Sequence, residues 1–259
     1  MNIMFNYNST IMKKVLFLLA ILSCTMVNAQ KRISIDTWNG SDLTKYDGQQ
    51  KDISMLRYMF NGWNTFCVPF DMTEEQIDAV FGSDCKVETL VGAEGDANDV
   101  TVYFDDVKSK GIEANKPYLV YFSGESKYLR VNMTGVIVKA KTAEAVSFKT
   151  ADGTDVMLAG IYSRSEGLNH YGIPAKDNGE VNFVAITSEH NGIYPTRCSL
   201  CVSGSNFAKV RAMHGTPSGI DNVNMTNASE GTIYNIKGVK TNANEKGILI
   251  INGKKHINK

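Results

Sequence analysis

The chain has 259 residues, of which 43% are hydrophobic and 21% charged, so it is long enough for one large or two modest domains and is not wholly disordered. Lysine plus arginine equals aspartate plus glutamate, at 27 each. This balance argues against the basic surface that nucleic acids or anionic lipids require. The 22 glycines, 11 tyrosines and 11 phenylalanines are typical of a β-rich protein with many turns.

Residues 1–29 have the pattern of a secretory signal. Lys13 and Lys14 precede an apolar run over residues 15–22, which has the length of a signal-peptide core. That run is too short for a transmembrane helix, so we expect no membrane span in the mature chain. Because the residues before Met12 add nothing to the signal, the natural start is predicted to be Met12.

The cleavage site is predicted between Ala29 and Gln30, where small residues stand at the two positions that signal peptidase reads. Acylation of Cys24 in a lipoprotein signal is the less favoured alternative, because Leu22 is bulkier than the residue usual at its position. Either route predicts an exported protein, extracellular or on the outer cell surface.

The mature chain begins with short apolar bursts that predict strands. Ile33 and Ile35 alternate with polar residues, residues 53–58 form a second burst, and Asp47–Gly48 gives a turn signal between them. Pro69 predicts the end of the next strand, because proline cannot donate to a β-ladder. Further strand-like runs cover residues 100–104, 118–122, 128–138, 156–162, 181–187, 193–202 and 207–212.

One helix is predicted directly after Pro69. Thr73 stands at the N-cap, Gln76 follows three residues later as in a capping box, and Gly82 lies just past the end. Glu74 and Glu75 complement the positive end of the helix dipole. The buried stripe is expected to contain Ile77, Val80 and Phe81.

The spacing of the strands predicts an all-β fold, an antiparallel β-sandwich or partly open barrel over residues 30–216. Alternating βα units would need several helices, and the sequence predicts only one. The strongest turn signals are Asn178–Gly179 and Asn191–Gly192. Residues 217–231 are polar and predict a linker, and residues 232–259 are expected to form a small β module with strands at 232–236 and 247–252.

Several segments resemble a β-rich module of secreted and surface proteins from the Bacteroidota: residues 56–70, 73–81, 112–120 and 193–197. The tail is similar to C-terminal sorting domains of the type IX secretion system, although shorter. The resemblance implies export through that machinery, with the tail as its address. A retained structural cap is the alternative. The tail residues that carry the resemblance are Ile233, Tyr234, Asn235, Gly238, Lys246, Gly247, Asn252 and Gly253.

Four cysteines remain after cleavage, and in an oxidising compartment they are expected as disulfides or buried thiols, with no pairing favoured. Cys198 and Cys201 have the spacing of a redox or zinc motif, but they stand in a predicted strand, where residues three apart face opposite sides. A zinc site with His190 and His214 is the weaker interpretation. The four cysteines are Cys67, Cys85, Cys198 and Cys201.

No catalytic or cofactor-binding fingerprint is present, so no catalytic residue, cofactor or metal is predicted. Acidic residues crowd at two places, and a hydrolase acting on glycan or peptide would draw its acids from residues 96–106. Solvated loop carboxylates are the favoured interpretation. The acids are Asp96, Asp99, Asp105, Asp106, Asp152 and Asp155.

Aromatic residues offer either core packing or a binding face. Trp63 is expected to be buried, and Tyr171, in a turn-rich segment, is expected to be exposed. The other candidates are Trp38, Tyr118, Tyr121, Tyr128 and Tyr162. We therefore expect an exported, non-catalytic protein that binds a glycan or a host or matrix protein, or builds a surface assembly. A secreted hydrolase is the alternative.

Overall fold

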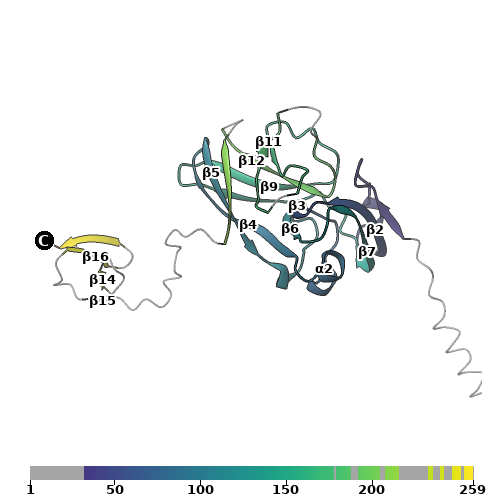
Figure 1. Cartoon of the computed structure of the whole chain (residues 1–259), viewed down its shortest axis with the longest axis horizontal. Coiled ribbons are helices and arrows are strands. Elements are labelled where there is room, and N and C mark those ends of the chain that lie inside the picture. The colour runs from purple at the N-terminus through teal and green to yellow at the C-terminus, as the bar shows by residue number, and fades with distance from the viewer. Residues whose placement is uncertain are drawn as a thin grey trace, which may run out of the picture. The chain divides into compact units, whose positions relative to one another are not determined.

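The computed structural model describes residues 32–177, 179–187, 192–204, 208–215, 233–235, 240–241, 247–251 and 254–258. The chain divides into two compact units, Met1–Thr216 and Pro217–Lys259 (Figure 1). The predicted signal, its cleavage site, Cys24 and the linker lie outside the described residues, as do four residues of the sorting-like tail, Gly238, Lys246, Asn252 and Gly253.

The first unit has the predicted all-β fold and is built around a central five-stranded sheet in the order β13-β5-β4-β6-β3. Its neighbouring strands are antiparallel except β13 and β5, which are parallel. The strands are β3 (Gly62–Phe66), β4 (Lys86–Gly95), β5 (Asp99–Asp106), β6 (Tyr118–Phe122) and β13 (Lys209–His214). The sheet is curled, since Trp63 on one edge strand stacks on His214 of the other, with ring centroids 4.7 Å apart.

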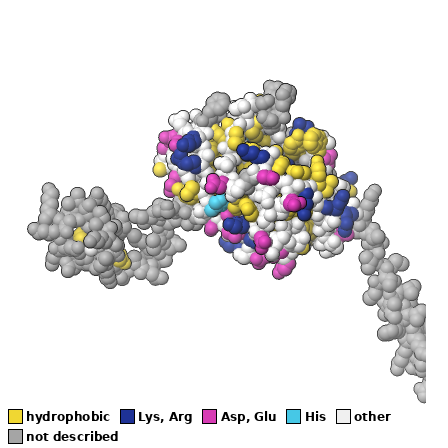
Figure 2. All heavy atoms as spheres, viewed as in Figure 1, with side chains coloured by type: hydrophobic (Ala, Val, Ile, Leu, Met, Phe, Trp, Pro, Cys, Tyr) yellow, Lys and Arg dark blue, Asp and Glu magenta, His cyan; other side chains and the backbone are white. Residues whose placement is uncertain are grey.

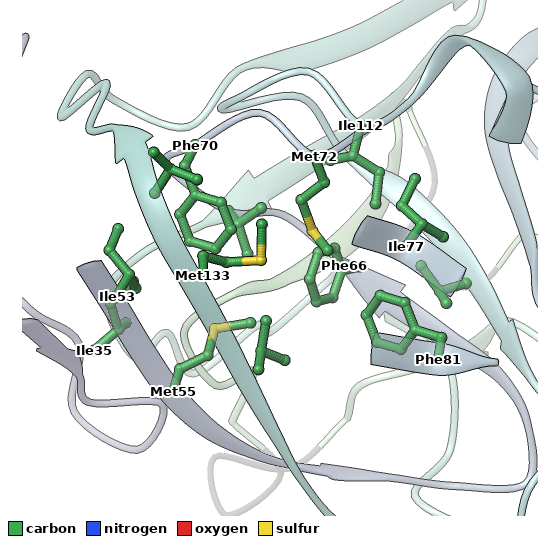
Figure 3. Packing of buried hydrophobic residues seen from close by; sticks show 14 of the residues in the cluster. Ile35, Ile53, Met55, Phe66, Phe70, Met72, Ile77, Phe81, Ile112 and Met133 are labelled. Atoms are coloured by element: carbon green, nitrogen blue, oxygen red, sulfur yellow. The ribbon is translucent and has the colours of Figure 1, made fainter. Parts of the chain in front are cut away.

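One face of the central sheet is covered by a three-stranded sheet and the helix α2. The small sheet has the order β1-β2-β7, with β1 (Ile33–Ile35) parallel to β2 (Gln50–Met59) and β7 (Lys127–Ile137) antiparallel to it. The predicted turn at Asp47–Gly48 therefore belongs to a longer crossover, which includes the 3-10 turn η1 (Thr44–Tyr46). The apolar cluster between these layers contains Met55, Phe66, Phe81 and Met133 (Figure 3).

The other face packs against a second five-stranded sheet in the order β11-β10-β12-β9-β8. A second apolar cluster fills this sandwich and contains Phe104 and Leu119 from the central sheet and Leu158 and Leu200 from its partner. The strands are β8 (Ala145–Lys149), β9 (Asp155–Ile161), β10 (Tyr171–Gly172), β11 (Val184–Ala185) and β12 (Arg197–Val202).

The predicted helix forms at the predicted place. α2 spans Glu74–Phe81, with Gly82 as its C-cap. The backbone N–H of Gln76 donates to Thr73 Oγ1 at 3.4 Å, and the backbone N–H of Thr73 donates to Gln76 Oε1 at 2.9 Å, which completes the capping box. Ile77 and Phe81 are buried, so the helix lies against the sheet as its apolar stripe requires.

Several strand boundaries differ from the predicted ones. β4 was not predicted, because a register shift between Leu90 and Gly92 interrupts its alternation of apolar and polar residues. The strand predicted at 181–187 is only Val184–Ala185, paired with β10 across a long loop rather than a tight turn. β12 begins at Arg197, four residues later than predicted. Asn178 and Asn191 of the predicted turns lie outside the described residues.

The second unit has four strands where two were predicted. β14 (Ile233–Asn235) lies between β15 (Lys240–Thr241) and β16 (Gly247–Ile251), and β17 (Lys254–Asn258) pairs with β16. Ile251 is opposite Lys254 in the register, so only Asn252 and Gly253 stand between β16 and β17. An Asn-Gly pair is a strong hairpin signal, and the lysines after it belong to a strand rather than to a closing tail.

Candidate functional site

An open pocket of about 520 Å³ lies in the first unit and has largely apolar walls. Its volume lies within the range of small-molecule sites, about 300–1,000 Å³. We call it the aromatic pocket, because three aromatic side chains share its wall with aliphatic ones. Its lining residues are Tyr58, Phe60, Thr65, Gly172, Ile173, Pro174, Ala175, Val184, Ala185, Ile186, Gly192, Ile193, Tyr194, Arg197 and Cys198.

All three sheets of the first unit contribute residues to the aromatic pocket. Tyr58, near the end of β2, packs its ring edge-on to Phe60 with centroids 4.9 Å apart, and to Tyr128 of β7 at 5.0 Å. The opposite wall comes from the loop after β10 and from β11, around Ile173 and Val184. Tyr128 is 69% exposed, so the aromatic surface continues from the pocket onto the outer face of the small sheet.

A second aromatic group stands at the rim of the pocket. The ring of Trp38, which is 58% exposed, lies 4.6 Å from that of Tyr194, centroid to centroid. The Arg164 guanidinium lies over both rings, 5.3 Å from the Trp38 centroid and 4.9 Å from the Tyr194 centroid. Cation–π contacts of this kind hold the rings in place and leave part of the indole face open.

Two arginines give the pocket a local positive charge. Arg197 lines it, and the Arg57 side chain is only 2% exposed. Arg57 donates from Nη1 to the carbonyl of Thr196 at 2.6 Å and from Nη2 to the carbonyl of Thr65, while its buried Nε has no hydrogen-bond partner among the described residues. Burial, and next the charge of Arg197, lower the pKa of Arg57, and burial also lowers the pKa of Arg197.

Thr196, between the pocket-lining residues Tyr194 and Arg197, has a strained backbone. Its φ is +64°, a left-handed conformation that β-branched residues rarely adopt. Its carbonyl accepts hydrogen bonds from Arg57 and from the backbone N–H of Cys67, the latter at 3.1 Å, and its own N–H donates to the carbonyl of Ile161 at 2.8 Å. These bonds fix the turn that aims Arg197, and strain held in this way is common at functional sites.

The clustered acids do not converge on the pocket. Asp99 and Asp106 are the first and last residues of β5, so seven steps of about 3.3 Å place them roughly 20 Å apart, beyond the reach of one catalytic carboxyl pair. Asp99 pairs with Arg211 at 2.6 Å. The Asp96 carboxylate accepts from the backbone N–H groups of Asn98 and Asp99 at 2.7 and 3.1 Å.

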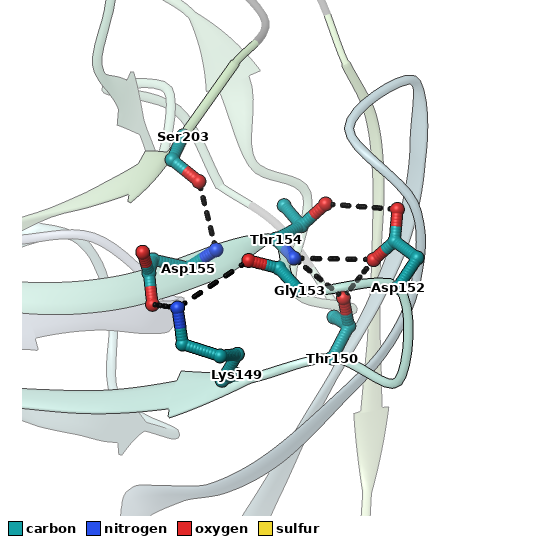
Figure 4. Close-up of polar contacts among 7 residues, drawn as sticks. All are labelled: Lys149, Thr150, Asp152, Gly153, Thr154, Asp155 and Ser203. Carbon is teal, nitrogen blue, oxygen red and sulfur yellow. Dashed lines mark hydrogen bonds and ion pairs between the residues drawn. The ribbon is translucent and has the colours of Figure 1, made fainter.

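The other acidic pair stabilises the turn between β8 and β9 (Figure 4). Asp152 accepts from the Thr154 backbone N–H and hydroxyl, each at 3.1 Å, and from the Thr150 hydroxyl. Asp155 forms an ion pair with Lys149 at 2.7 Å. Acidic and basic side chains are interspersed on the face shown in Figure 2, as their equal numbers suggest.

The two neighbouring cysteines of β12 face opposite sides, as expected. Cys198 is buried in the sandwich, where its thiol donates to the carbonyl of Phe66 at 3.2 Å. Cys201 Sγ lies 3.3 Å from Nδ1 of His170, and the Ser199 hydroxyl lies 2.9 Å from the same nitrogen. Burial raises the pKa of the Cys201 thiol and lowers that of His170, so the pair does not form the thiolate–imidazolium ion pair of an activated cysteine near pH 7.

The proposed zinc ligands do not come together within the described part of the chain. His214 contacts Glu88 at 2.7 Å and stacks on Trp63, and His190 lies outside the described residues. No group of three or more histidine, cysteine, aspartate or glutamate side chains suited to a metal occurs among the residues that the structure describes. The four cysteines that the structure describes are free thiols: Cys67, Cys85 and Cys198 buried, Cys201 half-buried.

The predicted aromatic candidates divide between core and surface. Trp63 is 3% exposed, as expected, but the prediction for Tyr171 was wrong, since it is 2% exposed. Tyr171 begins β10 and pairs with Leu200 of β12, which directs its ring into the sandwich core. The pocket residues Tyr58, Tyr194 and Arg197 lie in segments that carry the resemblance, but none was predicted as a binding residue, because no local motif marks side chains that only the tertiary fold brings together.

Comparison with protein-family models, with curated proteins and with solved structures finds no match to this chain. Within the described residues, no helix has both the length and the apolar character needed to cross a membrane.

Proposed function

We propose that the protein is an exported, non-catalytic binding protein and that the aromatic pocket is its binding site. The observation that carries the proposal is the pocket itself: an open hollow of small-molecule size with apolar walls, exposed aromatic faces at its rim and one arginine. Such a combination of apolar wall and few polar groups is usual for ligand sites. The ligand is either a free small molecule or the terminal group of a larger glycan or protein.

Three features favour binding over catalysis. Asp99 and Asp106 stand at opposite ends of β5, and the carboxylates of Asp96 and Asp152 are held in turns, so these acids do not form one carboxyl pair. The Cys201–His170 contact joins two neutral groups on the sheet face opposite to Cys198. Among the residues that the structure describes, the pocket wall contains no carboxylate and no histidine.

A pocket-blocking variant tests the site. Ala175 lines the pocket and is exposed, so Ala175→Trp is expected to place an indole in its mouth without disturbing the core. Ala151, exposed in the turn after β8, provides the matched control Ala151→Trp. The mature chain and both variants are to be screened on a glycan array, on immobilised matrix proteins and, by thermal shift, against a panel of small metabolites.

The proposal expects that compounds bound by the wild type and by Ala151→Trp are lost or weakened at least about tenfold in Ala175→Trp. Equal binding by all three proteins would show that the aromatic pocket is not the site. Mass spectrometry of each bound compound after prolonged incubation is expected to find it unchanged, and a cleaved product would contradict a non-catalytic role.

Export, and the role of the tail as a sorting signal, are part of the same proposal and rest on the sequence. Mass spectrometry of the native protein from cell fractions reports both chain ends. We expect a chain that begins at Gln30, lies outside the cell and lacks roughly the last 30 residues. An acylated Cys24 with an intact tail would overturn the type IX route and make the second unit a structural cap of a lipoprotein.

A further inference from the structure

The positive charge at the aromatic pocket has no counter-charge among the described residues. Neither Arg57 nor Arg197 forms an ion pair there, although other arginine and lysine side chains of the first unit do. Arg57 is buried and Arg197 is half-buried, and they lie close enough for the charge of Arg197 to lower the pKa of Arg57. Buried charges in proteins are normally paired, so an unpaired arginine in a pocket wall indicates a place for an anion.

The nearby thiols do not supply this counter-charge. Burial raises the pKa of Cys67 to about 12 and the pKa of Cys198 well above its usual value, so both remain neutral. Arg57 instead donates hydrogen bonds to the backbone carbonyls of Thr65 and Thr196. The dipoles of two peptide groups do not neutralise the full positive charge of a guanidinium. Within the described part of the chain, the charges of Arg197 in the pocket wall and of Arg57 behind it therefore have no anionic partner.

The rest of the wall is apolar and selects against a highly hydroxylated ligand. Aliphatic side chains, among them Ile173, Val184 and Ile186, face a cavity whose polar side-chain groups are few: the Thr65 and tyrosine hydroxyls and Arg197. A sugar acid would lose hydration of most of its hydroxyls without finding partners. A flat or branched apolar body would bury its surface between the aliphatic wall and the rings of Tyr58 and Tyr194.

We propose that the aromatic pocket binds a monocarboxylate with an apolar body, with its carboxylate on Arg197 and its hydrocarbon part against Ile173, Ile186 and Tyr58. The inference rests on the proposed function and specifies its ligand class. The guanidinium fork of arginine matches a carboxylate in geometry and in charge. The part of the pocket wall that the structure describes has no lysine, which disfavours a phosphate dianion. A free aryl or alkyl acid and the C-terminus of a peptide ending in a large apolar residue share this chemistry.

The test compares acids with matched neutral amides by calorimetry on the mature chain. 4-Phenylbutyrate serves as the free acid, 4-phenylbutyramide as its neutral counterpart, N-acetyl-Gly-Phe as the peptide-terminus probe, and glucuronate as a hydroxylated acid. The variants are Arg197→Gln, which removes the proposed carboxylate partner, and the control Arg211→Gln, which removes a guanidinium of β13 that pairs with Asp99 and does not line the pocket.

We expect the wild type and Arg211→Gln to bind 4-phenylbutyrate or the peptide about tenfold or more tightly than the amide, and Arg197→Gln to lose that preference. The tighter of these two probes identifies the source of the carboxylate. Equal affinity of the wild type for acid and amide, tighter binding of glucuronate, or a preference that survives in Arg197→Gln would each overturn the proposal. Because the acid and the amide are compared on the wild-type protein, this part of the test remains valid even if Arg197→Gln does not fold.

The outcomes separate this inference from the function on which it rests. If neither apolar carboxylate binds, while other ligands bind and are lost in Ala175→Trp, the ligand class is wrong and the site stands. If ligands bind equally to Ala175→Trp, the site itself is wrong.

Discussion

At the scale of single residues, Arg57 is the side chain that connects the core to the pocket. It extends from β2 into the first apolar cluster, where its guanidinium lies 5.2 Å from the Phe66 ring centroid. Its hydrogen bonds join the carbonyls of Thr65 and Thr196, which stand in different layers of the fold. A buried arginine in place of an apolar side chain lowers stability. We therefore attribute the presence of Arg57 to its positioning role and its charge at the pocket, and not to packing.

The four thiols of the mature chain are expected to differ in reactivity. At pH 8 a thiol whose pKa is about 12, as at Cys67, is ionised in only about one molecule in ten thousand, and only the thiolate reacts with iodoacetamide. Cys198 is fully shielded as well. We therefore predict that iodoacetamide modifies Cys201 of the native mature protein first and leaves Cys67 and Cys198 intact, as measured by peptide mass spectrometry.

Alkylation in concentrated urea is the control, in which all four cysteines are expected to react. Modification of Cys198 as fast as Cys201 in the native protein would contradict the burial of β12 in the sandwich. Recovery of disulfide-linked peptides from native material would contradict the free thiols directly.

At the scale of elements, the helix was predictable and β4 was not, for a physical reason. Every end signal of α2 is local: the cap, its partner at Gln76 and the glycine at Gly82 all lie within ten residues. β4 lacks such signals, and both its register shift and the buried, charged Glu88 interrupt the expected alternation. Glu88 is tolerated because His214, from a strand more than 100 residues later, contacts it, and no local pattern contains that information.

The aromatic pocket was unpredictable for a related reason. Its wall is assembled from β2, the segments after β10 and β11, and the turn before β12. These segments meet only when the small sheet and the second five-stranded sheet have packed against the central sheet. Trp63 was expected in the core because it directly precedes the apolar segment over residues 66–70, and it stands in the fully buried strand β3. The same reasoning placed Tyr171 on the surface, since β10 is only two residues long and has no strand pattern of its own.

The N-cap of α2 allows a direct test at this scale. Replacing Thr73 by alanine removes the acceptor for the backbone N–H of Gln76, which is expected to lower the free energy of unfolding by about 1 kcal/mol. In a domain of this size the same change lowers the melting temperature by about 2–4 °C. Urea denaturation followed by circular dichroism measures it.

Thr73→Ser keeps the hydroxyl and serves as the matched control, with stability expected close to that of the wild type. A Thr73→Ala variant as stable as the wild type would show that the capping box contributes nothing and that packing of Ile77 and Phe81 alone holds the helix.

At the scale of the whole molecule, the first unit contains a complete core. Both apolar clusters are formed by residues between Ile33 and Ala208, together with a few half-buried neighbours up to Ala212. The central sheet is curled until its edge strands meet through Trp63 and His214, so β13 is an integral strand rather than an appendage. Removal of the second unit should therefore leave the sandwich and the aromatic pocket unchanged.

We predict that a fragment of residues 30–216 unfolds cooperatively, with a melting temperature within about 2 °C of that of the mature chain and the same ligand affinities. The matched control is a fragment of residues 30–206, which lacks β13. It exposes Val100 and Val102 of β5 and deprives that strand of its six-residue parallel partner, so it is expected to lose cooperative unfolding. If the longer fragment were also unfolded, the second unit would be required to complete the first, and a tail that is removed after export would be incompatible with a stable mature protein.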